Sequence, residues 1–166
     1  MNLGFIGTGE ITKSVVIGLL GSKQKFKKIY LSKRNKKISK QLKNLSSKIK
    51  VLNNNQDIIN KSNWIFLSIT PDVGKKIIKK LKFKKKQVII SFISTIKLKE
   101  LKGYIKSKNI IIRAIPLPPI ALGVGPVPIF PPNKKVKIFF NKIGSTVEIK
   151  NEKLSINFWS TSGMMA

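Results

Sequence analysis

The chain of 166 residues contains no cysteine and no histidine. Without them the sequence excludes disulfides, thiolate nucleophiles, serine–histidine triads and the usual zinc or iron sites. Acidic residues are also scarce, with 6 against 34 basic ones, and they are scattered too widely to suggest a carboxylate pair or a metal cage. No metal site is therefore predicted, and the reactive group for any chemistry must come from a cofactor.

Arginine is nearly absent as well, because Arg34 and Arg113 are the only two. Sequence-specific readers of nucleic acid favour arginine for bidentate contacts that lysine does not reproduce. Lysine, isoleucine and asparagine are all used heavily, so a strongly A+T-rich genome explains the net charge of +28 more simply than a nucleic-acid partner does. We expect polyanions to bind at low salt without specificity, and a nucleic-acid-binding domain is only a third hypothesis.

The sequence also lacks an apolar run that could span a membrane. The longest apolar tract, from Ile110 to Pro132, contains seven of the eight prolines. A spanning helix does not tolerate prolines at that density. The apolar N-terminus is broken by glycines and has no basic leader, so no signal peptide is predicted. A cytoplasmic location without a membrane partner is the resulting expectation.

The first 115 residues alternate short apolar runs with amphipathic, lysine-rich segments. Apolar strands that alternate with helices predict a parallel sheet covered on both faces. Right-handed connections make this a Rossmann-type, doubly wound and mostly parallel α/β fold. The predicted strands are Leu3–Ile6, Lys28–Leu31, Lys48–Leu52, Trp64–Ile69, Gln87–Ile93 and Asn109–Ala114. The predicted helices are Glu10–Leu20, Lys36–Leu45, Gln56–Lys61, Asp72–Leu81 and Lys97–Lys106.

The pattern changes after Pro116, where a stiff loop reads PLPPIALGVGPVPIFPP. Extended structure near Val127–Phe130, a helix near Asn133–Lys142 and a strand near Thr146–Ile149 are predicted to complete a dinucleotide-binding domain over residues 1–150. Residues 151–166 begin another predicted helix, which ends on Met-Met-Ala with neither a C-cap glycine nor a basic last turn. We expect these residues to be the first turns of a helical domain, cut inside a longer protein.

The stretch GFIGTGEIT, from Gly4 to Thr12, is a candidate dinucleotide-binding loop. It joins the first predicted strand to the first predicted helix, where Gly7 permits a tight turn and Gly9 lets the backbone approach a pyrophosphate. The helix that follows offers free N–H groups and a favourable dipole. Thr12 stands where a third small residue is usual, so its packing must loosen or its hydroxyl must find a partner. A plain strand-to-helix turn, with glycines for geometry alone, is the alternative.

The end of the second predicted strand bears on which dinucleotide would bind. NAD sites usually carry an Asp or Glu on the ribose diol, about 20 residues past the glycines. This chain has no acid between Glu10 and Asp57 and has Ser32, Lys33 and Arg34 instead. A hydroxyl and two cations suit a 2′-phosphate. NADP(H) is therefore the preferred cofactor, and NAD(H) stays an alternative.

The order of several segments resembles that of the pyrroline-5-carboxylate reductases. These segments are GFIGTGEIT, LSKRNKK, NQDIINKSNWIFLSITP, QVIISFIS and IIRAIPLPP. A closer resemblance is to a divergent, reductase-like branch of that family. It rests on the segments GTGEIT, IPLPPIALGVGPVPIFPP and FWSTSGMMA. The resemblance covers essentially all of the chain as the family's N-terminal NADPH-binding domain. It implies a second, all-helical domain that forms a homodimer and completes the active site between subunits.

The resemblance also implies roles for the residues that match the family's motifs. The implied cofactor-binding residues are Gly7, Thr8, Gly9, Glu10 and Ile11 at the pyrophosphate, Ser32 and Arg34 at the 2′-phosphate, Asn55 beside the adenosine, and Ile69, with Thr70 and Pro71 at the ribose. Candidate substrate contacts are Pro116, Thr161 and Ser162. No residue is assigned as catalytic.

Three departures from the family's motifs leave the substrate open. The family's Met-Pro-Asn-Thr-Pro loop reads Ile115-Pro116-Leu117-Pro118-Pro119, its Ala-Ala-Gly reads Ile93-Ser94-Thr95, and its Ser-Gly-Ser reads Thr161-Ser162-Gly163. The segment from Pro116 to Pro132 is accordingly either a rigid loop that closes the sheet or a segment that faces the substrate.

The activity implied by the resemblance is NADP(H)-dependent hydride transfer to a cyclic imine in proline biosynthesis. A protonated imine accepts hydride directly at carbon, so the protein's task is positioning and electrostatics, which a chain without histidine or cysteine can perform. Two alternatives remain open. One is reduction of a different imine or carbonyl substrate, and the other is a non-catalytic NADP(H)-binding or sensor protein.

Overall fold

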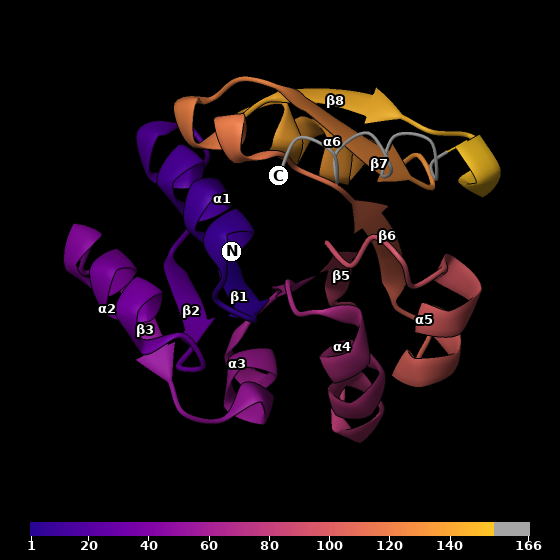
Figure 1. Ribbon diagram of the computed structural model, residues 1–166, viewed down its shortest axis with the longest axis horizontal. Coiled ribbons are helices and arrows are strands. Elements are labelled where there is room, and N and C mark those ends of the chain that lie inside the picture. The colour runs from indigo at the N-terminus through magenta and orange to yellow at the C-terminus, as the bar shows by residue number, and fades with distance from the viewer. Residues whose placement is uncertain (155–166) are drawn as a thin grey trace.

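The computed structural model describes residues 1–154 of the chain. Its strands are β1 (Asn2–Ile6), β2 (Lys28–Ser32), β3 (Ile49–Leu52), β4 (Trp64–Leu67), β5 (Val88–Ser91), β6 (Ile110–Ala114), β7 (Pro126–Phe130) and β8 (Ser145–Glu148). They form one sheet in the order β3-β2-β1-β4-β5-β6-β7-β8 (Figure 1). Neighbouring strands are parallel except for β6 and β7, which are antiparallel. The predicted doubly wound, mostly parallel fold is confirmed.

Helices cover both faces of the sheet. They are α1 (Glu10–Gly21), α2 (Lys36–Leu45), α3 (Asn55–Lys61), α4 (Pro71–Ile77), α5 (Leu98–Ile105) and α6 (Lys134–Phe140), with 3-10 helices η1 (Ile78–Lys80) and η2 (Pro118–Leu122). One buried cluster joins α1, α2, η2 and α6 to the sheet, and a second joins α3, η1 and α5 to the opposite face. Each face of the sheet therefore has its own core.

The two cores explain why the central strand β4 is apolar throughout. In β4, Phe66 belongs to the first cluster, while Ile65 and Leu67 belong to the second. Successive side chains of a strand point to opposite faces, so a strand buried on both faces has few polar positions. Phe5 of β1 stacks on Phe66 with their ring centroids 4.4 Å apart, which fixes the two central strands against each other.

The segment after β6 contains the predicted elements and one additional short helix. Strands β7 and β8 and helix α6 lie close to their predicted positions. The proline-rich segment between β6 and β7 was predicted as a stiff loop, and within it Pro118–Leu122 forms η2, which Gly123 ends with φ 76°. Proline suits the first positions of such a helix because its φ is already near the helical value. Likewise, the single helix predicted over Asp72–Leu81 divides into α4 and η1.

The candidate substrate contacts Thr161 and Ser162 lie outside the described residues. The division into residues 1–150 and 151–166 stays a prediction. Among the helices that the structure describes, none is long and apolar enough to cross a membrane.

Candidate cofactor-binding site

Two connected clefts lie at the carboxyl ends of the central strands. Both include Gly9 from the turn after β1, and Ser68, Ile69 and Thr70 from the segment after β4. From β1 the chain continues to β2 on one side, whereas β4 lies on the other side of β1. The clefts therefore occupy the topological switch point, where open α/β sheets bind their ligands.

The first cleft has a volume of about 620 Å³ and extends toward the end of β2. Besides the shared residues it is lined by Gly7, Thr8, Arg34, Asn35 and Lys36. The second cleft has a volume of about 300 Å³ and extends toward the end of β5. Its further lining is Glu10, Ile11, Pro71, Phe92, Ile93 and Ser94. The first cleft is thus basic, and the second is bordered mainly by apolar side chains.

Gly7 and Gly9 are glycines for different reasons. Gly7 has φ 99°, and a Cβ there would lie 1.9 Å from the carbonyl oxygen of Ser68. The fold itself therefore requires Gly7. Gly9 has φ −98° and ψ −170°, which any residue can adopt, and a Cβ there would meet nothing within 4 Å. Packing does not explain Gly9, but a ligand that approaches the backbone through both clefts would.

Gly9 is also the N-cap of α1, and it provides no side chain to cap the first N–H groups of that helix. Unsatisfied N–H groups and the helix dipole favour an anion at this end of a helix. Together with the open space at Gly9, this end of α1 can accept a pyrophosphate. Glu10, the next residue, has an exposed side chain whose carboxylate is 3.6 Å from the ammonium of Lys13.

Thr12 fits the turn through its hydroxyl. Its side chain is fully buried, and its Oγ1 donates a hydrogen bond to the carbonyl oxygen of Gly7 over 2.9 Å. The sequence required either looser packing or a partner for this hydroxyl, and the partner is present. Thr12 therefore ties the first turn of α1 to the glycine whose conformation defines the loop.

Ser32 lies beneath the loop rather than along the cleft. It is 5% exposed, and its Oγ accepts a hydrogen bond of 3.0 Å from the N–H of Gly7. The Thr8 hydroxyl donates to the carbonyl oxygen of Ser32 over 2.6 Å. Ser32 thereby fastens the glycine turn to the end of β2, and its contact with a 2′-phosphate stays a prediction.

Arg34 lines the first cleft, as do Asn35 and Lys36, whereas the neighbouring Lys33 does not. The side chain of Asn35 accepts a hydrogen bond of 3.1 Å from the N–H of Ile38 and so caps α2. This cap fixes where α2 begins, and Lys36 is its first residue. The sequence singled out Arg34 but missed Lys36, because one lysine among so many carries no signal.

Two further predicted residues, Asn55 and Pro116, line neither cleft. Asn55 begins α3 and lines neither cleft. Pro116 is buried after β6 and is likewise absent from both linings. The loop that follows packs on α1, where a Cβ at Gly18 would lie 2.3 Å from the carbonyl oxygen of Ile120. The structure gives this loop a packing role, and substrate contact at Pro116 stays a prediction.

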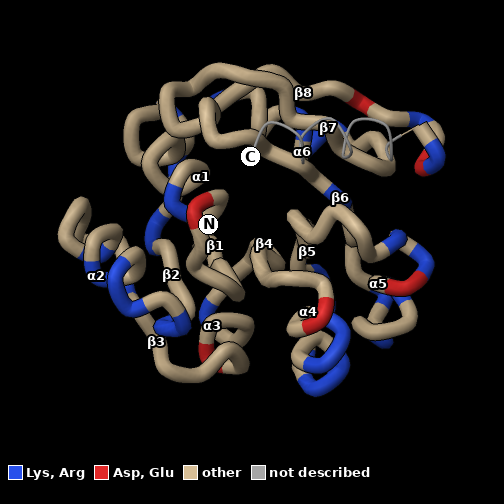
Figure 2. Tube along the Cα trace, in the orientation of Figure 1, with Lys and Arg blue, Asp and Glu red and all other residues tan. Residues whose placement is uncertain are grey.

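The positive charge is spread over several elements rather than collected at the clefts. Figure 2 shows Lys and Arg on α1, α2, α4 and α5, among other segments. A separate hollow of about 1240 Å³, where β5 and β6 begin, has six lysines in its lining: Lys85, Lys86, Lys102, Lys106, Lys108 and Lys135. No group of acidic side chains in the described part of the chain could hold a metal ion.

The fold and the two clefts at its switch point are those of a dinucleotide-binding domain. Residues 2–95 match the family described as NADP oxidoreductase, coenzyme F420-dependent, and the chain belongs to that family. The match spans β1 to β5, and so contains both clefts. A comparison with curated proteins finds no match.

Solved pyrroline-5-carboxylate reductases share the fold over nearly the whole chain. The Streptococcus pyogenes enzyme is 24% identical with a TM-score of 0.81, and the alignment covers 99% of this chain and 63% of that one. The Plasmodium falciparum enzyme, solved with NADP bound, is 20% identical with a TM-score of 0.81, covering 98% and 62%. The Coxiella burnetii enzyme is 17% identical with a TM-score of 0.84, covering 97% and 63%. The chain thus spans a little over three fifths of these relatives' length.

Proposed function

We propose that the protein is an NADP(H)-dependent reductase of the pyrroline-5-carboxylate reductase type, with the described residues as its cofactor domain. The observation that carries the proposal is the pairing of Gly9 with Arg34 along one cleft. Gly9 leaves open a space that packing does not require, and Arg34 supplies a cation where NAD sites usually have an acid. The NADP bound to the Plasmodium falciparum relative supports the same reading.

The residues present fit this cofactor. The turn at Gly9 and the amino end of α1 would hold the pyrophosphate. Arg34 and Lys36 would face the 2′-phosphate, where a guanidinium can make paired hydrogen bonds and an ammonium adds a point charge. The second cleft, with Ile11 and Phe92 in its lining, would receive the nicotinamide.

Bound NADPH would supply a hydride for the carbon of a protonated cyclic imine. The side chains of Ile11, Phe92 and Ile93 would keep water away from the transfer. The hydroxyls of Ser68, Thr70 and Ser94, from the same lining, could orient a polar substituent. The protein's contribution in this proposal is positioning rather than acid–base chemistry.

Turnover tests the reductase proposal. The full-length protein would be mixed with NADPH and pyrroline-5-carboxylate, and the absorbance of the reduced nicotinamide would be followed with time. Consumption of NADPH that depends on the imine supports the proposal. Tight NADPH binding without turnover of this or any related imine or carbonyl compound would contradict it and favour a non-catalytic binding or sensor protein.

The working protein is proposed to be a cytoplasmic homo-oligomer, as the resemblance to dimeric reductases implies. The matched relatives are longer than this chain, so their additional length could supply the subunit contacts. Light scattering on the purified full-length protein would give its mass in solution. A monomer at all concentrations would contradict this part of the proposal.

A further inference from the structure

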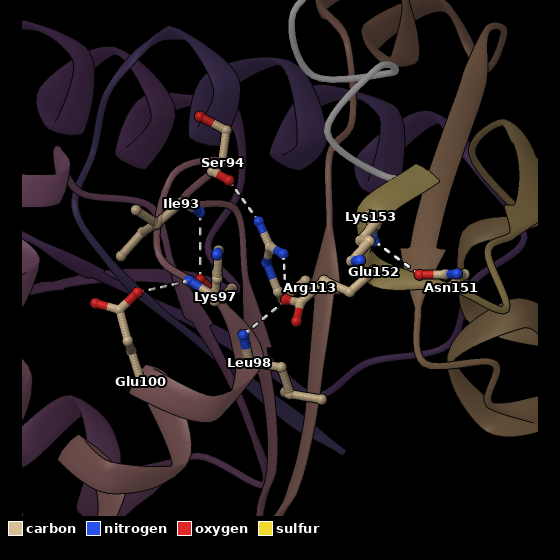
Figure 3. A network of polar contacts seen from close by, with 10 residues as sticks. Ile93, Ser94, Lys97, Leu98, Glu100, Arg113, Asn151, Glu152 and Lys153 are labelled. Atoms are coloured by element: carbon tan, nitrogen blue, oxygen red, sulfur yellow. Dashed lines mark hydrogen bonds and ion pairs between the residues drawn. The ribbon is translucent and has the colours of Figure 1, made fainter.

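Arg113 is a buried cation that the cofactor proposal does not use. It lies on β6, is 2% exposed, and packs at the carboxyl edge of the sheet. Its guanidinium donates to Oε1 of Glu152 over 2.5 Å and also to the carbonyl oxygen of Ser94 (Figure 3). Burial lowers the pKa of Arg113 from its usual value, and the hydrogen bond and charge of Glu152 oppose that shift.

Glu152 joins a third segment to this contact. The same Oε1 that receives the Arg113 hydrogen bond also accepts one of 2.8 Å from the N–H of Leu98, the first residue of α5. Glu152 belongs to the segment Asn151–Leu154, which follows β8. One carboxylate oxygen therefore connects β6, the start of α5 and the segment Asn151–Leu154.

The loop held by Arg113 forms a wall of the second cleft. Ser94, whose carbonyl oxygen accepts from Arg113, lines that cleft together with Phe92 and Ile93. The N–H of Ile93 donates to the Ser91 hydroxyl over 3.2 Å, which holds the loop at its other end. None of these residues lines the first cleft. A change at Arg113 or Glu152 can therefore alter the second cleft and leave the first unchanged.

We propose that Arg113 and Glu152 are positioning residues that couple the segment after β8 to the shape of the second cleft. The inference rests on the proposed function, because it assigns that cleft to the nicotinamide half of NADP(H). A planar guanidinium is suited to this task, since it can bond to a carboxylate and a carbonyl oxygen at once with fixed geometry. Movement of the segment Asn151–Leu154 would then alter how the nicotinamide is seated.

The test compares a ligand that fills both clefts with one that fills only the first. Calorimetry would measure NADPH and adenosine 2′,5′-bisphosphate binding to the protein and to Glu152→Gln, which keeps an acceptor oxygen but removes the charge. We expect NADPH affinity to fall about tenfold. The affinity for adenosine 2′,5′-bisphosphate should change less than about twofold, which also shows that the variant is folded.

Glu148→Gln is the matched control, because Glu148 forms an ion pair of 2.7 Å with Lys137 and lines neither cleft. It removes the same charge, and we expect both affinities to stay unchanged. Arg113→Lys is a second variant, which keeps the cation but loses the planar fork. It should reproduce the selective loss of NADPH affinity even where Glu152→Gln proves too unstable to study.

The results distinguish failure of the positioning role from failure of the proposed function. Equal losses for both ligands in the Arg113 and Glu152 variants, or no loss for either, would overturn the positioning role and leave only a stabilising ion pair. A loss of NADPH affinity in Glu148→Gln as large as in Glu152→Gln would also overturn it. Failure of the unmodified protein to bind adenosine 2′,5′-bisphosphate at all would overturn the proposed function instead.

Discussion

The hydroxyl of Thr12 donates a hydrogen bond of 2.9 Å to the carbonyl oxygen of Gly7. Thr12 is the first buried residue of α1, and Gly7 holds the positive φ on which the turn depends. The threonine thus uses a buried side chain to hold the glycine turn, at a position where a small residue normally allows close packing.

Thr12→Val should lower the free energy of unfolding by about 1–2 kcal/mol, because the nearly isosteric side chain leaves the Gly7 carbonyl oxygen without its buried partner. Chemical denaturation of the two proteins measures the difference. Thr12→Ser keeps the hydroxyl and serves as the control, with a smaller expected loss. If valine is tolerated as well as serine, the hydrogen bond does not hold the turn.

The two loop glycines should respond differently to alanine. Gly7→Ala forces a positive φ and a clash with Ser68, and should cost about 2–4 kcal/mol of stability. Gly9→Ala should leave the free energy of unfolding within about 1 kcal/mol of the unmodified protein. It should nevertheless weaken dinucleotide binding about tenfold, because the methyl group projects into the space proposed for the pyrophosphate.

Thermal or chemical unfolding measures the stability of both variants, and calorimetry measures their affinity for the dinucleotide. A Gly9→Ala protein that is stable and binds NADPH normally would show that the open space at Gly9 is not a ligand site. A Gly9→Ala protein as unstable as Gly7→Ala would show that packing requires both glycines.

Arg34→Ala should lower NADPH affinity about tenfold, since a charge-assisted hydrogen bond to a 2′-phosphate contributes about 1.5 kcal/mol or more. NADH has no such phosphate, so its affinity should change little. Lys33→Ala is the matched control, because it removes the same charge from the adjacent residue, which does not line the cleft. Equal losses for NADPH and NADH, or equal losses in the two variants, would show that Arg34 does not contact the phosphate.

Binding of double-stranded DNA should be unselective and strongly dependent on salt. The lysines are distributed over many elements, so the attraction is to phosphate charge rather than to base sequence. Titrations with two unrelated DNA sequences at increasing salt should give the same affinity for both, falling steeply with ionic strength. Selective binding that persists at about 0.15 M salt would instead indicate a nucleic-acid-binding domain.

The sheet and the glycine turn could be predicted from the sequence because their causes are local. Strands buried on two faces are mostly apolar, as in Trp64–Leu67, and a strand-to-helix turn with a positive φ needs a glycine, as at Gly7. The inward direction of the Ser32 hydroxyl could not be predicted, because a serine serves equally well as a ligand contact or as a support for the loop.

Contacts between residues far apart in the chain could not be predicted from the sequence either. Arg113 and Glu152 are 39 residues apart, and only the fold brings β6 beside the segment that follows β8. The sequence placed Lys36 correctly at the start of a helix, but only the structure shows that Lys36 lines the first cleft and Lys33 does not. The scarcity of arginine drew attention to Arg34, which lines the first cleft, but the sequence indicated no role for Arg113.

The most direct measurement of the central claim is a calorimetric titration of the unmodified protein with NADPH and, separately, with NADH. The cofactor-domain account predicts that NADPH binds to a single site per chain and binds more tightly than NADH, because Arg34 and Lys36 border the first cleft. The absence of binding by either dinucleotide, or a clear preference for NADH, would contradict it.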